Sequence, residues 1–313
     1  MAATGNWGLK DQILALKWIF FQRAIMASGT TLNLWAYTRN PRGTAFNIGR
    51  ILGITTDNST YLIQKLREID YKTLQAVSSV IYVGVSWNGL IFAPTVEPPH
   101  KDAVVLGKSH ENLKNCQFNK VPMIIGFNSQ EGIPFANILD KLRLYLLTYD
   151  LFPNRIIPID MNFITDDQFT RPICEAIRLI SKCASVYFYR FSYTGNLGLN
   201  VGQSERPFLG VGHGEDLNYL WRKSTNIPNP TESDILTRQR MIKLWTNFAK
   251  TGNPTPEQDP LLKNVTWTPV TPDTQYYLDI GRNLSMESDL SRYSISWWRE
   301  LYKQYGTPPY DTY

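Results

Sequence analysis

Residues 121–132 read VPMIIGFNSQEG. The run VPMIIG is almost wholly apolar, and a polar loop ends it, which predicts a short strand buried on both faces. The loop places Glu131 near the carboxyl end of this strand, where open α/β sheets hold their functional sites. The stretch therefore predicts a parallel sheet and, at one end of it, a candidate acidic residue.

Two more strands are predicted, at residues 23–30 (RAIMASGT, read as buried) and 185–193 (SVYFYRFSY). Helical spacing of apolar residues predicts helices at 5–19, 40–54, 59–77, 137–147, 170–183, 233–254 and 294–306. Strands that alternate with helices favour an α/β class with a mostly parallel sheet. Three recognisable strands are few for a chain of 313 residues.

Helix ends carry their own signals. Asn40 precedes Pro41 and is expected to cap the helix at 40–54. Ser233 or Asp234 is expected to cap the helix at 233–254, which Gly252 ends. The apolar face predicted for this last helix consists of Ile235, Met241, Ile242, Trp245, Phe248 and Ala249.

Composition excludes several classes of function. The net charge is +5 with no basic run, so there is no electrostatic footprint for nucleic acid. Residues 73–96 are uncharged, but polar residues, glycines and a proline interrupt them, which favours a strand with a long loop over a membrane span. The first residues lack a basic head followed by an apolar run, so no secretory signal is expected.

The cysteines and the sequons indicate different cellular compartments. Cys116, Cys174 and Cys183 have no metal-binding spacing, and we expect buried free thiols in a reducing, cytoplasmic compartment. The N-x-S/T triplets at Asn58, Asn264 and Asn283 are possible N-glycosylation sites and leave a secretory route open.

A second loop, residues 210–221 (GVGHGEDLNYLW), places His213 between two glycines. A histidine oriented by a buried carboxylate is what nucleophilic acyl transfer requires. Alternatives remain open: Glu131 could be an ordinary loop acid, and Glu215 and Asp216 could be helix-capping acids. The chain's other histidines, His100 and His110, are expected to face solvent, and with no zinc-type spacing we expect neither metal nor cofactor.

Six blocks together resemble the type-B carboxylesterases, which include cholinesterases and detoxifying esterases: GNWGLKDQILALKWI, RAIMASGT, VPMIIGFNSQEG, YRFSYTG, GVGHGEDLNYLW and LWTNFAKTGNPTP. They occur in family order along nearly the whole chain. The resemblance implies an α/β-hydrolase fold, with Glu131 as the triad acid and His213 as the triad base. The absence of recognisable cysteines for the family's extracellular disulfides, and the terminal WWRELYKQYG, resemble its intracellular detoxifying branch.

The family's nucleophile is not in this sequence. Its serine should precede Glu131 in G-x-S-x-G, because the triad runs serine, acid, histidine. Residues 84–88 (GVSWN) and 202–206 (GQSER) lack the closing glycine, and the second also follows the acid. By the resemblance, the elbow strand should lie between the blocks that meet at residues 19–23, and the family's N-terminal oxyanion loop is missing too. Ser28 is the nearest substitute and matches a family position that is not the nucleophile.

The sequence thus predicts a single, incomplete α/β-hydrolase domain over residues 1–313, with an internal deletion near 19–23 and no esterase activity. Complete relatives would hydrolyse small apolar carboxylic esters through an acyl-serine. Two alternatives remain open: a non-catalytic esterase-like protein that binds or sequesters esters, and an incomplete splice or gene-model product. Neither the natural substrate nor the oligomeric state can be read from the sequence.

Overall fold

The computed structural model describes residues 5–19, 21–38, 40–81, 92–135, 162–198, 210–221, 229–271, 273–288, 290 and 292–305. The chain divides into two compact units. One comprises Met1–Phe21, Thr31–Asn112 and Pro309–Tyr313, and the other Gln22–Thr30 with Leu113–Pro308. The helix predicted at 137–147 lies outside the described residues, and the single-domain organisation stays a prediction.

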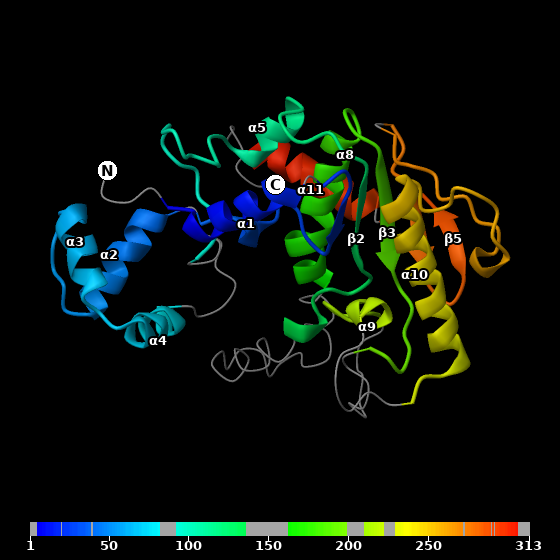
Figure 1. The fold of residues 1–313 in the computed structure, drawn as a ribbon, viewed down its shortest axis with the longest axis horizontal. Coiled ribbons are helices and arrows are strands. Elements are labelled where there is room, and N and C mark those ends of the chain that lie inside the picture. The colour runs from blue at the N-terminus through cyan, green and yellow to red at the C-terminus, as the bar shows by residue number, and fades with distance from the viewer. Residues whose placement is uncertain are drawn as a thin grey trace. The chain divides into compact units, whose positions relative to one another are not determined.

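The second unit is built on a five-stranded sheet (Figure 1). Its strands are β1 Ala24–Ala27, β2 Met123–Asn128, β3 Val186–Phe191, β4 Tyr277–Ile280 and β5 Leu284–Glu287. They lie in the order β1-β2-β3-β4-β5, and each pair is parallel except the antiparallel pair of β4 and β5. The α/β class and the three predicted strands are confirmed, whereas β4 and β5 were missed because their short sequences, YLDI and LSME, contain no continuous apolar run.

Burial differs sharply between neighbouring strands. All six residues of β2 are buried, as the apolar run at 121–126 predicts. β1 pairs with β2 from Ala24 to Ala27, and no described residue pairs with its other edge. The prediction that residues 23–30 form a buried strand is therefore right about the strand and wrong about its burial, because Ile25 is 41% exposed.

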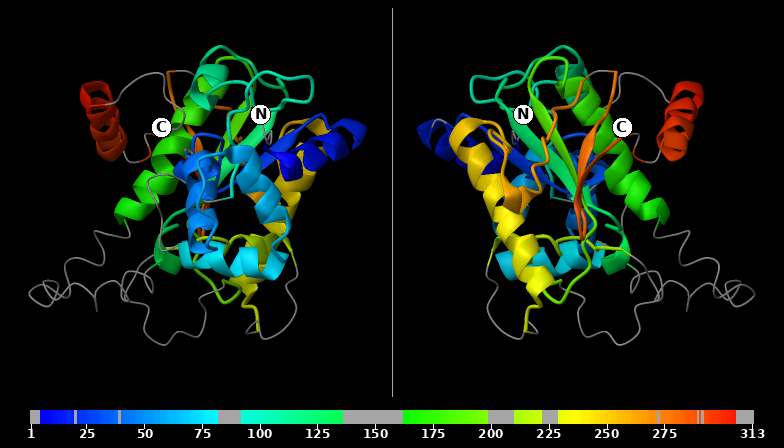
Figure 2. Two further views of the ribbon diagram at one scale, coloured as in Figure 1. Left: turned by 90° about the vertical axis from the view of Figure 1, so that its left-hand side faces the viewer. Right: turned by 90° about the vertical axis from the view of Figure 1, so that its right-hand side faces the viewer.

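Helices cover both faces of the sheet. Helix α8, Arg171–Ile180, lies on one face and α10, Glu232–Thr251, on the other, with the sheet between them in Figure 2. The α10 side of the sheet holds a core of buried aromatic and aliphatic residues: Ile124, Tyr187, Tyr189, Phe191, Tyr219, Met241, Leu244, Phe248, Trp267 and Leu278 among them. This core fixes the ends of β2 and β3, from which the candidate site loops emerge.

The ends of α10 depart from expectation. Thr231 caps the helix, not Ser233 or Asp234, and Asp234 closes a capping box by accepting from the Thr231 backbone. Gly252 ends the helix with φ +80°, as expected for a C-terminal glycine. The predicted apolar face is correct for Met241 and Phe248 but wrong for three residues that are exposed, namely Ile235, Ile242 and Ala249.

Two further elements complete the second unit's helical cover. The π-helix η4, Asp166–Thr170, runs directly into α8. Helix α11, Arg292–Tyr305, confirms the helix predicted at 294–306. The buried Arg171 guanidinium lies 5.0 Å from the Trp298 ring and 4.7 Å from the Tyr302 ring, so cation–π contacts hold α11 against α8. The remaining short elements are η2 Ile133–Phe135, α9 Leu217–Leu220 and η5 Pro260–Leu262.

The described secondary-structure elements of the first unit are helices. Its elements are α1 Trp7–Ile19, η1 Leu34–Ala36, α2 Pro41–Ile51, α3 Ser59–Arg67 and α4 Tyr71–Ile81, and α5 Ser109–Lys114 follows. Asn40 caps α2 by accepting from the Gly43 amide, as predicted. The single helix predicted at 59–77 is wrong, because the chain breaks at 68–70 and Asp70 accepts from the Thr73 amide. A strand was expected within 73–96; residues 73–81 belong instead to α4, and residues 82–91 lie outside the described residues.

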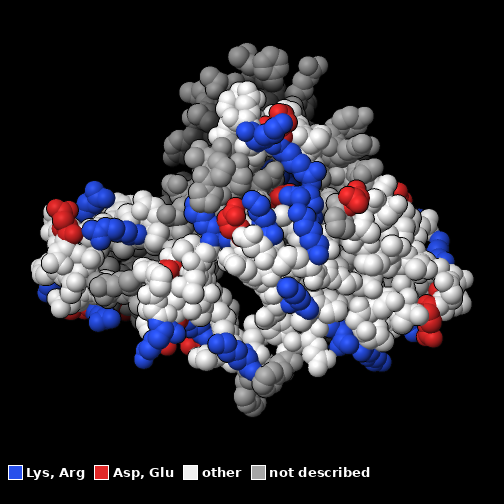
Figure 3. All heavy atoms as spheres, turned by 90° about the horizontal axis from the view of Figure 1, so that it is seen from above, with Lys and Arg blue, Asp and Glu red and all other residues white. Residues whose placement is uncertain are grey.

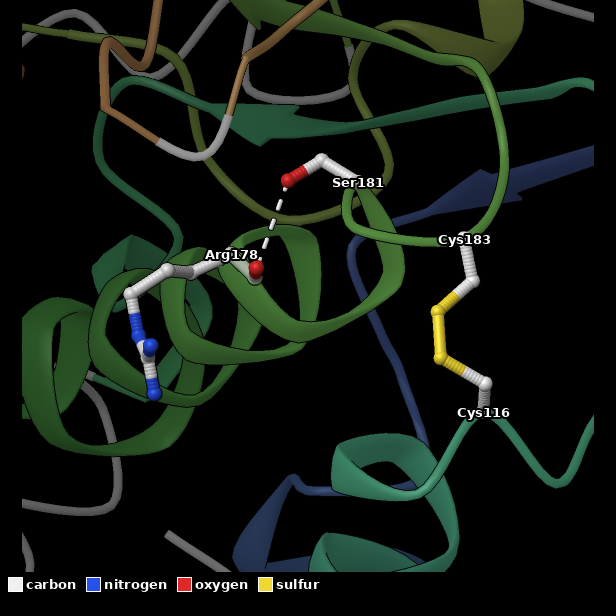
Figure 4. The surroundings of a disulfide bond; sticks show 4 residues. All are labelled: Cys116, Arg178, Ser181 and Cys183. Carbon is white, nitrogen blue, oxygen red and sulfur yellow. Dashed lines mark hydrogen bonds between the residues drawn. A yellow bond between two sulfur atoms is a disulfide. The ribbon is translucent and has the colours of Figure 1, made fainter.

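The cysteine prediction needs correction. Cys116 and Cys183 form a disulfide with their Cα atoms 6.1 Å apart (Figure 4). They precede β2 and β3, whose first residues pair side by side, so the fold brings them together. Free thiols were expected at all three positions, and only Cys174 is free; its burial raises the pKa of the thiol to about 12.

The described surface carries charged side chains of both signs (Figure 3). No helix in the described ranges is long and apolar enough to cross a membrane. On the face in Figure 3, Lys and Arg side chains gather near the middle of the view, with scattered Asp and Glu side chains and broad uncharged areas around them. The expectation that His110 faces solvent is wrong, because it is 8% exposed, and His100 is partly buried against Glu97.

Candidate active site

Glu131 lies in the loop after β2 and is completely buried. Its Oε1 accepts hydrogen bonds from the Asn128 backbone amide at 2.7 Å and from the Ser28 hydroxyl at 2.6 Å. A buried carboxylate without such donors would be costly, so these bonds stabilise it in place. They leave the second oxygen, Oε2, aimed at another group.

That group is His213, whose Nδ1 lies 2.7 Å from Glu131 Oε2. The His213 side chain is 46% exposed, whereas the acid behind it is fully buried. The hydrogen bond to Glu131 raises the pKa of His213, and the charges of Glu131 and Asp216 add to this, against the opposing effect of burial. The structure thus unites the two predicted site residues across 82 positions of sequence.

Backbone hydrogen bonds join the acid loop to the histidine loop. The Gln130 amide donates to the Val211 carbonyl at 2.8 Å, and the Val211 amide donates to Ser129 Oγ at 3.0 Å. The approach is close enough that a Cβ on Gly210 would lie 2.7 Å from the Gln130 Cβ. Gly210 and Gly214 have φ of +130° and +78°, conformations that favour glycine. The glycines around His213 therefore let two loops pack together, in addition to leaving space for the ring.

Two buried polar residues, Asn128 and Asp216, help to hold the histidine loop in place. Asn128 Nδ2 donates to the Gly212 carbonyl at 2.8 Å and to Asp216 Oδ1 at 3.1 Å. Burial raises the pKa of Asp216, although the hydrogen bond from Asn128 opposes that rise. The capping alternative is wrong for both acids: Asp216 makes no side-chain cap to α9, and Glu215 Oε1 accepts from the Gly212 amide at 2.9 Å.

The ring of Phe169 packs against the imidazole ring of His213. Its ring centroid lies 5.3 Å from that of His213, at a tilt of 44°. The ring projects from the π-helix η4, and π-helical turns are frequent at functional sites. Sequence reasoning missed Phe169 and Asn128. Asn128 ends a recognised strand beside the candidate acid, which is a usable signal, whereas nothing local distinguishes Phe169.

Ser28 lies at the C-terminal end of β1 in a left-handed conformation, with φ +57°. Its hydroxyl donates to Glu131 Oε1, the oxygen that does not bind His213. A nucleophilic serine instead donates to the histidine, which takes its proton. The geometry therefore makes Ser28 a support for the acid.

The arrangement could act chemically as an acid–base pair. Glu131 holds the Nδ1 side of the imidazole, so the remaining nitrogen, Nε2, is the one that can take or give a proton. Because the ring is half-exposed, a reacting group can reach it from solvent. Among the described residues there is no group of three His, Cys, Asp or Glu side chains that could hold a metal ion.

Comparison with known proteins identifies similar chains. The model of the carboxylesterase family matches residues 19–146 and 143–298. Carboxylesterase 1E of Mus musculus is 25% identical over 376 residues, covering 95% of this chain and 64% of the relative. Bile salt-activated lipase of Rattus norvegicus is 24% identical over 389 residues, covering 97% and 61%. The chain therefore spans less than two thirds of the length of these relatives.

Solved structures give the same fold. Juvenile hormone esterase from Manduca sexta, in a structure with OTFP covalently attached, superposes with a TM-score of 0.73 at 22% identity, covering 90% of this chain and 60% of that one. PNB esterase superposes with a TM-score of 0.65 at 20% identity, covering 88% and 58%. The sheet of this chain is thus part of an α/β-hydrolase fold, as predicted.

Proposed function

The chain belongs to the carboxylesterase family, and from that premise we propose that Glu131 and His213 are the acid and base of an esterase triad whose serine this sequence lacks. The observation that carries the proposal is the 2.7 Å contact between His213 Nδ1 and the buried Glu131 carboxylate. The two residues also follow the chain order expected after a nucleophilic serine in this fold.

In a complete enzyme of this class, the relay would act on a carboxylic ester. Glu131 would keep the Nδ1 proton in place and stabilise the imidazolium while Nε2 accepts the proton of the attacking hydroxyl. The same Nε2 would then protonate the leaving alkoxide, and a second cycle with water would release the acid. Small apolar esters are the substrate class we propose for the complete protein.

We propose further that this chain has no esterase activity as written. Without an elbow serine, His213 has no side-chain nucleophile to activate, and the oxyanion amide that follows the elbow serine is absent with it. An internal deletion is supported by two facts. The stretch aligned with the mouse relative, 376 residues, exceeds the 313 residues of this chain, and one edge of β1 has no partner among the described strands.

One of the two arguments for the intracellular, detoxifying branch was the lack of recognisable disulfide cysteines. It no longer holds, because Cys116 and Cys183 form a disulfide. The terminal WWRELYKQYG still resembles that branch. We therefore propose ester hydrolysis as the activity of the complete protein and assign the chain to no branch of the family.

The test is covalent labelling of the purified chain with a fluorophosphonate probe, together with turnover of a p-nitrophenyl ester. We expect no stoichiometric labelling, and turnover no higher than that of the His213→Ala variant, because losing a triad nucleophile costs roughly a million-fold in rate. Stoichiometric labelling of one serine, abolished by its substitution with alanine, would overturn the proposal.

A graft provides the positive control. The segment of a complete relative that carries G-x-S-x-G would be inserted between residues 19 and 23, with the relative's N-terminal oxyanion part added. We expect this chimera to be labelled, and we expect the His213→Ala and elbow Ser→Ala versions of it to be unlabelled. A folded chimera that stays unlabelled would show that Glu131 and His213 are not a working relay.

A further inference from the structure

The three sequons of the chain occupy exposed positions in loops and turns. Asn58 is the N-cap residue of α3, Asn264 follows η5, and Asn283 lies in the turn between β4 and β5. All three asparagines are exposed to solvent. Exposure is what an attached oligosaccharide requires, because a bulky polar chain cannot be packed against a core.

Asn264 lies in a tight turn after η5. It and the preceding Lys263 both adopt left-handed backbone conformations, with φ of +53° and +54°. The Asn264 backbone amide donates to the Asp259 carbonyl at 2.9 Å, which holds the turn without using the side chain. Thr266, the third residue of this sequon, is exposed as well.

Asn58 has a structural role that is compatible with modification. Its Oδ1 accepts from the backbone amides of Thr60 at 2.9 Å and Tyr61 at 3.2 Å, which caps α3. N-glycosylation uses the other atom of the amide, Nδ2. The capping oxygen therefore stays available, and helix α3 keeps its N-terminal hydrogen bonds when a sugar is attached.

The Cys116–Cys183 disulfide is an independent observation that points to the same compartment. Disulfides form and persist mainly in oxidising environments such as the lumen of the endoplasmic reticulum, and are rare in the cytosol. The endoplasmic reticulum is also where sequons receive their oligosaccharide. One cellular route therefore accounts for the disulfide and for the sequons.

We propose that this protein matures in the secretory pathway, with N-linked oligosaccharides on Asn58 and Asn264 and with Cys116 paired to Cys183. Each asparagine Nδ2 attacks C1 of a lipid-linked oligosaccharide. The N–C1 bond forms, the bond from C1 to the lipid pyrophosphate breaks, and one amide proton is released. The two thiols lose two protons and pass two electrons to a thiol–disulfide oxidoreductase.

The third sequon is left out of this assignment. Asn283 Oδ1 accepts from Lys263 Nζ at 2.5 Å, so its side chain is held against the turn that carries Asn264. Its sequon also runs into a paired strand, since Leu284 is buried and Ser285 pairs with Asp279. The Asn283→Gln variant therefore serves as a negative control.

The sites are tested by expressing the full chain behind a secretory leader in eukaryotic cells and treating it with peptide-N-glycosidase. Thr266→Ala and Thr60→Ala should each remove one glycan step from the electrophoretic pattern. Thr266→Ser and Thr60→Ser keep the sequons and should leave the pattern unchanged, as should Asn283→Gln. Mobility that the enzyme does not change, or an Ala variant that migrates like its Ser partner, would overturn the assignment at that site.

The compartment is tested on the native protein from its source cells, because a leader imposes the route. In a non-reduced digest we expect the peptides of Cys116 and Cys183 to be linked. After enzymatic deglycosylation in heavy-oxygen water, we expect Asn264 and Asn58 to be converted to labelled aspartate. Cysteines that alkylate fully before reduction, or asparagines found unmodified, would overturn the proposed route.

Discussion

Strands β1 and β2 are neighbours in one sheet and have opposite surroundings. β2 pairs on both sides and has all six of its residues buried, whereas β1 pairs on one side only among the described strands. The same residue type shows the contrast: Ile125 is 0% exposed and Ile25 is 41% exposed. The difference teaches that the strand leading to Glu131 is paired on both sides. Strand β1 has one side unpaired among the described strands, and there the family resemblance predicts a further strand.

The open edge has a physical consequence. An exposed edge strand presents unpaired backbone amides and carbonyls and invites pairing with another chain. In the other unit, helix α1 also exposes large apolar side chains, Trp7 and Leu14 among them. The proposed deletion near residues 19–23 would therefore have its effect at these exposed residues, whereas Glu131 and His213 keep the hydrogen bonds described above.

The largest expected effect tests the contrast between the strands directly. Ile125→Ala should lower the free energy of unfolding by about 2–5 kcal/mol, because it leaves a cavity in a packed core. Ile25→Ala should change it by only about 0.5 kcal/mol, because the side chain lies at an exposed edge. Denaturant unfolding with a constant slope measures both.

If Ile125→Ala does not fold, Ile125→Val provides a milder change, with an expected loss of about 0.5–1.5 kcal/mol. A loss at Ile25 as large as that at Ile125 would mean that something covers the β1 edge in solution. In that case the two strands would not differ as the structure indicates.

A second prediction concerns the disulfide that joins the segments before β2 and β3. Cys116→Ser should lower the free energy of unfolding by about 2–4 kcal/mol, because the bridge closes a loop of 67 residues and restricts the unfolded chain. The loss should appear in thermal or denaturant unfolding. The matched control is Cys174→Ala, which removes a buried thiol and leaves the bridge intact. If reduction of the wild type leaves its stability unchanged, the bridge does not stabilise the complete side of the sheet.

The smallest effect is a pH dependence at the relay. The pKa of His213 is raised in the folded state by its bond to Glu131, so its contribution to stability is complete below the unfolded pKa. That contribution is lost as the pH rises through the higher, folded-state pKa. An NMR titration should resolve His213, because the chain has three histidines.

Glu131→Gln is the control for this titration. It removes the charge that raises the pKa and should move the His213 titration to lower pH, with a flatter dependence of stability on pH. An unchanged titration would mean that the 2.7 Å contact does not control the protonation of His213.

Much of the fold could be predicted because its signals are local. The apolar run before Glu131 and the aromatic run at 185–193 specify β2 and β3 without help from distant residues. Strands β4 and β5 could not be predicted in this way, since YLDI and LSME contain no continuous apolar run and form strands by pairing with β3 and with each other. Caps were partly predictable: Asn40 was correct, while Thr231 was missed.

By itself, the sequence determined the α/β class, the two candidate residues Glu131 and His213 and their order, and the absence of G-x-S-x-G. These features depend on short patterns of neighbouring residues, which are visible in the sequence itself. Only the tertiary structure decided that these two residues meet, that Cys116 pairs with Cys183 and that β1 pairs on one side only among the described strands. The physical reason is that each of these joins segments far apart in the sequence, and the sheet order alone determines which segments become neighbours.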